Sequence, residues 1–500
     1  MAGESPFRPH SPSSHRRMKR TFLTNLALLL VLNLLVKPFY ILGIDAGVQD
    51  AVGAEGYGVY AALLSLSFLL NIVLDLGITN FNTRHIAQHT HLLGKTLGGL
   101  AGMRFALVGV YALLTLGAGL ALGYSGAQLG TLGWLVLNQA LAATLLYLRS
   151  NIAGAQRYRQ DSLLSVLDRI LLIGVVGWLL WGRAGGEAFR IEWFVWAQTG
   201  AYAVATLVAL LLVLRLSGPV RLSVRPTFSL VVLRQSFPYA LLILLMTLYY
   251  RIDTLMLERL LPDGALQAGI YAQGFRFVEA LNMLGYLFAG LLLPIFSRML
   301  KAREDVAPLA LLAWRLLLAG SLAVAAFGAF HAGTVLDLRY SEDTTTAAAP
   351  FALLLWCFVA VSTTYVFGTL LTAAGDLRLL NRMAAAGALV NIGLNLWLIP
   401  LWKAEGAAWA SLITQVGTAL LQVVLVLRSR RLPGVVRVVL GALVHGALLL
   451  AAAWWLGGLA WGLGAQMLAF GALALASAVA TGLLDVRSIP QVQAMLQRGR

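Results

Sequence analysis

The chain is 500 residues long; 59% of its residues are hydrophobic, only 12% are charged, and its mean hydropathy is +0.81. This composition excludes an ordinary soluble domain. The formal net charge of +16 is compatible with nucleic-acid binding or with membrane topology, so the positions of the basic residues must decide between them.

Apolar segments of about 18 or more residues recur along most of the chain, each close to the roughly 20 residues with which a helix crosses a bilayer. These long unbroken runs predict helices, because the strands of a membrane barrel alternate polar and apolar residues. The sequence therefore predicts an all-α integral membrane protein with about fourteen transmembrane helices. They are expected near residues 21–43, 57–79, 99–121, 128–148, 163–182, 191–214, 237–260, 271–295, 306–330, 349–373, 380–401, 406–428, 435–457 and 460–484.

The predicted helices divide into two pseudo-symmetric lobes of six and a final pair. Gly58-Val59-Tyr60 and Gly269-Ile270-Tyr271 each lie near the start of a helix that follows an acidic outer loop, and six helices separate the two copies. An even number of helices preserves orientation, so this echo predicts lobes related by an axis along the membrane normal, with a cavity between them. The expected boundaries are 1–20 for a disordered basic tail, 21–215 for the N-lobe, 216–236 for a cytoplasmic linker, 237–430 for the C-lobe, 431–484 for the last two helices and 485–500 for a C-terminal tail.

The basic residues follow the predicted topology. Most of the 37 Lys and Arg residues fall in the two tails and in every second loop, which places both termini in the cytoplasm and argues against nucleic acid as a partner. The short loops leave no room for a soluble catalytic domain. Cys357 is the only cysteine, so no intramolecular disulfide or CxxC metal site is expected. The GKT at 94–96 is not a P-loop, because His89 stands where the first glycine belongs.

Seven stretches carry motifs: EGYGVY (55–60), DLGITNFNTRHIA (75–87), YYRIDTLML (249–257), AGIYAQGFRFVEAL (268–281), LLPIFSRML (292–300), GTLLTAAGDLRLLNRM (368–383) and NIGLNLWLIPLWKAEGAAWASLITQ (391–415). In this order they resemble bacterial polysaccharide biosynthesis flippases, the Wzx-type oligosaccharide or O-antigen translocases of the multidrug/oligosaccharidyl-lipid/polysaccharide exporter superfamily. The chain departs from the resemblance at TVLDLRY (334–340), where relatives usually have a Leu-Tyr-Gly-like turn. This departure leaves the structure of one outer loop open.

The resemblance implies a function. A polyprenyl-diphosphate-linked oligosaccharide would move from the inner to the outer leaflet of a bacterial inner membrane by alternating access, for lipopolysaccharide or other surface polysaccharide assembly. It implies membrane lipid, and a polysaccharide polymerase with its chain-length machinery, as further partners, and no cofactor. Alternatives remain: a cation-coupled multidrug exporter of the same superfamily, an integral-membrane glycan ligase or polymerase, and a scaffold without transport.

Charged residues inside the spans are the candidate site residues, because charges in a bilayer are costly and normally face a cavity or one another. A diphosphate needs charge compensation, which arginine supplies as a planar fork and lysine as a point charge. Lys37 and Arg251 lie at comparable depth on the first helices of the two lobes, which line the central cavity in this superfamily, and Arg276 follows on the next helix of the C-lobe. These three are the predicted substrate-binding residues. The cations in the spans are Lys37, Arg104, Arg169, Arg251, Arg276 and Arg315, and the nearby acids are Asp75, Asp168, Asp253 and Glu279.

The same charges also allow structural ion pairs. Arg276 and Glu279 are three residues apart and can pair along one helix face. Arg251 and Asp253 point about 200° apart around a helix, so Asp253 needs another partner. Either a cation such as Arg169 or Arg276 pairs with it across helices, or it binds Na⁺ or H⁺ as a coupling residue.

Two further features concern gating. Asp75 and Arg84 are close enough in sequence to form a cytoplasmic gate pair. Pro38 directly follows Lys37, so a bend there would swing the cation as a hinge, or would be a static kink.

Overall fold

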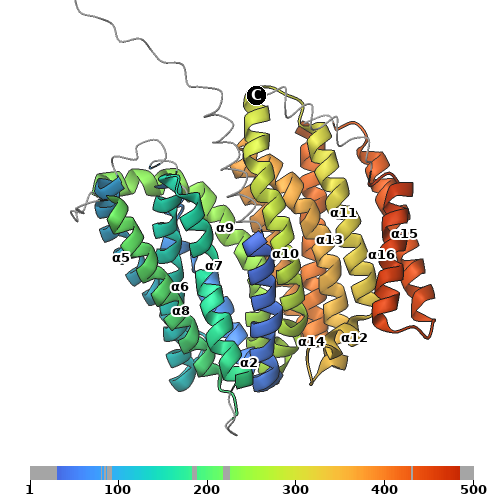
Figure 1. Ribbon diagram of the computed structural model, residues 1–500, viewed down its shortest axis with the longest axis horizontal. Coiled ribbons are helices and arrows are strands. Elements are labelled where there is room, and N and C mark those ends of the chain that lie inside the picture. The colour runs from blue at the N-terminus through green and yellow to red at the C-terminus, as the bar shows by residue number, and fades with distance from the viewer. Residues whose placement is uncertain are drawn as a thin grey trace, which may run out of the picture.

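The computed structural model describes residues 31–484 except 80–81, 84–85, 87–92, 183–187, 218–225 and 430–431. The described residues form helices and their connections, without a strand (Figure 1). Helical residues 31–39 lead into η1 (Tyr40–Asp45), a π-helical turn. The chain then forms α2 (Ala46–Leu69), α3 (Ile72–Asp75), α5 (Leu93–Ala121), α6 (Gly126–Gly154), α7 (Tyr158–Gly177), η3 (Trp178–Gly182), α8 (Ile191–Ser217), α9 (Pro226–Leu260), α10 (Gly264–Lys301), α11 (Ala307–Phe330), α12 (Ala332–Asp337), α13 (Thr344–Ala374), α14 (Leu377–Ser429), α15 (Val435–Gly457) and α16 (Leu463–Ala480).

The described residues contain 12 helical segments that are long and apolar enough to cross a membrane, which makes the chain a multi-pass membrane protein. The predicted number was about fourteen. Two segments account for the difference, because 31–75 and 377–429 are each about twice the length of one span. Each is interrupted by one residue with non-helical geometry, Gly53 (φ +75°) and Lys403 (φ +52°), where the sequence predicted an outer loop.

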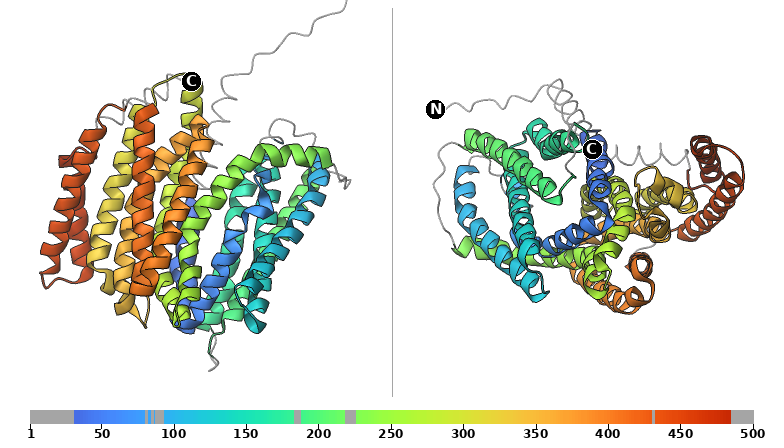
Figure 2. Two further views of the ribbon diagram at one scale, coloured as in Figure 1. Left: turned by 180° about the vertical axis from the view of Figure 1, so that it is seen from behind. Right: turned by 90° about the horizontal axis from the view of Figure 1, so that it is seen from below.

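The helices form two bundles that stand side by side (Figures 1 and 2). One contains α5 to α8 and the other α10 to α14, with α2 and α9 between them. Helices α15 and α16 pack at the outer edge of the second bundle, where α15 contacts α11. The two bundles come together at the end that carries α12 and diverge toward the opposite end.

A reciprocal close contact joins α2 to α10 at the α12 end. A Cβ on Gly58 would lie 1.8 Å from the backbone oxygen of Ala265, and a Cβ on Gly269 would lie 1.9 Å from that of Ala54. Each glycine thus faces the alanine that precedes the other by four residues. The paired glycines that the sequence identified as an echo are therefore a two-sided contact at which only glycine fits.

Alanine at Gly58 or Gly269 is expected to lower the free energy of unfolding by about 1–3 kcal/mol, because the added methyl overlaps backbone that cannot rotate away. Thermal unfolding in detergent measures the effect. The matched control is Gly109→Ala on α5, where a Cβ meets nothing within 4 Å, so it should not destabilise the protein. Equal unfolding midpoints for the three variants would show that this contact does not hold the bundles together.

The stretch TVLDLRY (334–340) forms the end of α12 and the turn after it. Arg339 donates from Nε to the carbonyl oxygen of Leu42 (2.6 Å) and from Nη2 to that of Gly43 (2.9 Å). Both carbonyls belong to the η1 turn, and π-helical turns often mark functional sites. Next to it, Ser341 donates from its backbone N and its Oγ to Asp50 (2.8 Å each). This segment thus holds the first described helix against the second bundle.

Candidate functional site

A cavity of about 190 Å³ lies between the two bundles and is lined from both of them. Helical residues 31–39, η1, α2, α6, α7 and α8 supply one wall, and α9 and α10 supply the other. Four cations and two carboxylates line it, which leaves an excess of two positive charges. The charged lining residues are Lys37, Asp45, Arg169, Arg251, Arg276 and Glu279.

Arg276 is the centre of a buried polar cluster that spans the two bundles. Its Nε lies 3.2 Å from a carboxylate oxygen of Asp45, and its Nη1 lies 2.6 Å from Glu279. Its Nη2 donates to the hydroxyl of Tyr57 (2.6 Å), which in turn donates to Asp45 (2.7 Å). Nη1 and Nη2 of the guanidinium are thus hydrogen-bonded, whereas Nε has an ion-pair contact with Asp45 and no hydrogen bond to a described residue. Two carboxylates and one hydroxyl therefore compensate this buried charge.

Arg251 reaches the same cluster from α9. Its Nη2 lies 2.5 Å from Oε1 of Glu279, so this carboxylate bridges Arg251 and Arg276. The guanidinium also lies over the ring of Phe68, 4.7 Å from its centroid. The predicted pair of Arg276 and Glu279 along one helix face is present, and no sequence pattern indicated that Arg251 would share Glu279. Together with Asp45, these residues form a cluster of zero net charge.

Lys37 differs from the other cations of the cavity. It has no ion-pair or hydrogen-bond partner among the described residues, although it is only partly exposed. Arg169 lies 3.5 Å from Asp168 and 4.5 Å from the ring centroid of Tyr40. Because Arg169 is paired with Asp168, Lys37 is the cation of the cavity that carries uncompensated charge among the described residues.

The backbone near Lys37 leaves α-helical geometry. Pro38 follows it, and the π-helical turn begins two residues later at Tyr40. Tyr40 and Asp45, the two ends of this turn, both line the cavity. Proline and π-turns are the usual causes of helix bends, so the geometry here agrees with a bend at the predicted hinge.

Asp253 lies outside the central cavity and is not part of an ion pair, which was one of the two expectations for it. It is 1% exposed and accepts hydrogen bonds from Tyr271 (2.9 Å), Asn395 (2.7 Å) and Ser411. These partners are all neutral. The expected ion pair with Arg169 or Arg276 is wrong for this structure, because those arginines bind Asp168, Asp45 and Glu279.

The predicted gate pair of Asp75 and Arg84 cannot be followed, because Arg84 lies outside the described residues. Asp75 instead forms an ion pair with Arg104 at 3.3 Å and accepts a hydrogen bond from the backbone N of Thr79 (3.1 Å). Arg104 also lies 4.6 Å from the ring centroid of Tyr147. Asp75, the last residue of α3, is thus paired with a cation of α5.

The sequence missed two members of the site. Asp45 fell in the predicted loop after the first span, and Tyr57 appeared only within the motif EGYGVY (55–60). The apolar neighbours Ile44, Ala46 and Val48 were the available signal that Asp45 lies inside the membrane, since a surface loop is normally polar.

Several solved membrane transporters have a similar fold. The chain is similar to the lipid II flippase MurJ in its inward closed conformation (TM-score 0.65, 12% identity, 91% of this chain and 98% of that chain). It is similar to a mutant of the Vibrio cholerae MATE transporter VcmN (TM-score 0.58, 17% identity, 84% and 99%). It is also similar to an inward-facing multidrug resistance MATE family transporter of the MOP superfamily (TM-score 0.57, 14% identity, 81% and 98%). At these identities the likeness establishes the fold alone.

No curated protein sequence matches the chain. A family model described as polysaccharide biosynthesis protein matches residues 22–300, which is more than half of the chain. The resemblance predicted from the seven motifs is thereby confirmed. The chain belongs to the polysaccharide biosynthesis protein family.

Proposed function

We propose that the chain is a non-enzymatic flippase. It moves a polyprenyl-diphosphate-linked oligosaccharide from the inner to the outer leaflet of a bacterial cytoplasmic membrane by alternating access, for surface polysaccharide assembly. The observation that carries this proposal is the excess of positive charge in the cavity between the two bundles. A membrane-embedded cavity with this charge favours an anionic head group. Membership of the family and the likeness to a lipid II flippase support the same substrate class.

Lys37 and Arg251 have different parts in this proposal. Lys37 has no partner among the described residues, so it binds an entering diphosphate without first breaking an ion pair. Arg251 reaches the diphosphate by giving up Glu279, which stays paired with Arg276 at 2.6 Å. Arg276 then organises the cluster between the bundles, and a bend at Pro38 moves Lys37 as the cavity changes its access.

Cells provide the first test. In a strain that lacks the protein, the lipid-linked oligosaccharide should accumulate in the inner leaflet, and surface polysaccharide should be lost. A membrane-impermeant glycan-modifying reagent applied to spheroplasts distinguishes the leaflets. Equal labelling of the lipid-linked pool in wild-type and deletion strains would contradict the proposal. In this scheme polymerase and chain-length machinery act on the flipped product, and both termini of the flippase are cytoplasmic.

Asp253 is the proposed coupling residue. Its carboxylate is buried among neutral hydroxyl and amide groups from α10 and α14, a setting in which it can take up H⁺ or Na⁺. Two buried amide atoms near Asp253 make no hydrogen bond to a described residue. They are Oδ1 of Asn395 and Nδ2 of Asn391. The site thus has unused polar capacity next to a single carboxylate.

Asp253→Asn is expected to remove the response of translocation to an imposed H⁺ or Na⁺ gradient while the protein still folds. The amide oxygen can accept from Tyr271 and Ser411, and the NH₂ can donate to Oδ1 of Asn395 once the amide of Asn395 turns over. Initial rates in proteoliposomes with and without each gradient measure this. Asp263→Asn is the control, since Asp263 pairs with exposed Lys403 in the outer loop. A gradient response in Asp253→Asn equal to that of the wild type would exclude coupling at this residue.

A cation-coupled multidrug exporter is the second candidate, favoured by the likeness to MATE transporters. Its substrates would be lipophilic cations, which the positive excess of the central cavity repels. Gradient-driven efflux of tetraphenylphosphonium from cells with normal surface polysaccharide would favour the exporter. The absence of such efflux, together with loss of polysaccharide in the deletion strain, would favour the flippase.

A further inference from the structure

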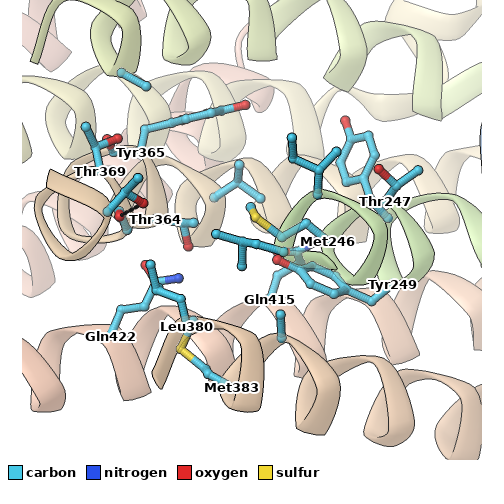
Figure 3. A pocket seen from close by; sticks show the side chains of 18 of the residues that line it. Met246, Thr247, Tyr249, Thr364, Tyr365, Thr369, Leu380, Met383, Gln415 and Gln422 are labelled. Carbon is cyan, nitrogen blue, oxygen red and sulfur yellow. Dashed lines mark hydrogen bonds between the residues drawn. The ribbon is translucent and has the colours of Figure 1, made fainter. Parts of the chain in front are cut away.

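A second cavity, of about 350 Å³, lies inside the second bundle between α9, α10, α13 and α14 (Figure 3). No charged side chain lines it. Its volume is near the lower end of the range of about 300–1,000 Å³ that is usual for ligand pockets. A cavity of this size suits one part of an oligosaccharide. Its most distinctive lining residues are Tyr249, Tyr250, Tyr286, Tyr365, Gln415 and Gln422.

Two polar atoms in this cavity lack the partners that buried groups normally have. Oγ1 of Thr364 and Oε1 of Gln422 are buried and make no hydrogen bond to a described residue. Gln422 is only 2% exposed, and its amide lies against Gly368 of α13. Figure 3 shows Gln422 directed toward Thr364 across the cavity. Because buried polar atoms are almost always satisfied, these two atoms point to a polar ligand.

Helices α9 and α10 line both cavities. Tyr250 lines the neutral cavity and the next residue, Arg251, lines the cationic one. On α10, Tyr286 faces the neutral cavity, and Glu279, two turns earlier, faces the cationic one. A ligand with a charged part and a neutral part can therefore place each part in a matching cavity.

We propose that the neutral cavity binds an uncharged sugar ring of the transported lipid-linked oligosaccharide. This inference rests on the proposed flippase function. Sugar hydroxyls both donate and accept hydrogen bonds, as amides and threonine hydroxyls do, and the C–H face of a sugar ring packs on aromatic rings such as Tyr286 and Tyr365. A lipophilic cation would find rings there but no carboxylate among the lining residues.

The test uses the variant with Thr364→Val and Gln422→Leu, which keeps the volume of both side chains. Neither lost oxygen has a described partner, so the variant should fold as stably as the wild type. Full-length protein in nanodiscs is titrated with two probes, undecaprenyl diphosphate and the lipid-linked oligosaccharide extracted from cells that lack the protein. Ser362→Ala is the control, because Ser362 lies on the same helix and donates to its own helix backbone at Phe358 (2.8 Å).

The wild type should bind the sugar-bearing probe more tightly than the bare diphosphate. The Thr364→Val, Gln422→Leu variant should lose about tenfold or more of affinity for the sugar-bearing probe only. If the variant binds both probes as the wild type does, the sugar site is wrong while the flippase function stands. If the wild type binds neither probe, or binds tetraphenylphosphonium in their place, the flippase function and the sugar site both fall.

Discussion

Replacing Lys37 with alanine is expected to lower the initial rate of oligosaccharide translocation about 10- to 100-fold, since a charge-assisted hydrogen bond to phosphate contributes about 1.5–3 kcal/mol. The unfolding midpoint should not fall, because the substitution breaks no ion pair or hydrogen bond between Lys37 and the described residues. It also removes a partly buried charge, whose burial is unfavourable. Rates in proteoliposomes and thermal unfolding of the same preparations give the two quantities.

Two controls separate charge from packing at this position. Lys37→Arg keeps the charge and should retain much of the rate, whereas Lys37→Met keeps the apolar stem and should behave like alanine. Lys301→Ala removes an exposed lysine at the end of α10 and should leave the rate unchanged. Wild-type rates for Lys37→Met would remove this residue from the substrate site.

Arg276→Ala should be the most destabilising substitution in the cavity. It leaves buried Asp45 without its cation and partly buried Glu279 with one partner in place of two. Breaking a buried pair in this way is expected to lower the free energy of unfolding by about 3–5 kcal/mol. Thermal or denaturant unfolding in detergent, compared with the wild type, measures the loss.

A double variant tests whether the loss of stability in Arg276→Ala comes from the unpaired carboxylate of Asp45. Adding Asp45→Asn to Arg276→Ala removes the stranded carboxylate and should recover part of the lost stability, as coupled neighbours do in a double-mutant cycle. The same addition should not help Lys37→Ala, which strands no carboxylate. Additive effects of Arg276→Ala and Asp45→Asn would mean that the 3.2 Å contact between them contributes little.

Much of the fold followed from the sequence because hydropathy reports directly which segments can lie in lipid. The echo at Gly58 and Gly269 also had structural meaning, since a close two-sided helix contact leaves a glycine in each partner. The division of spans was less certain. At Gly53 and Lys403, where the sequence predicted an outer loop, the structure has a single residue of non-helical geometry instead.

The site was only partly predictable. Depth in the membrane follows from position in a span, so Lys37 and Arg251 could be placed at one level, and both do line the central cavity. Pairing depends on how each helix is rotated and on what faces it, which sequence spacing does not report. Asp253 shows this, because its partners Asn395 and Ser411 lie on either side of the break at Lys403, more than a hundred residues away along the chain.

The most direct test of the flippase function uses proteoliposomes that contain the purified protein and the lipid-linked oligosaccharide in both leaflets. A membrane-impermeant glycosidase added outside reports how much of the oligosaccharide is reachable over time. The wild type should make nearly the whole pool reachable, whereas Lys37→Ala vesicles should stay close to the outer-leaflet share found in protein-free vesicles. An identical time course for wild-type and protein-free vesicles would contradict the proposed function.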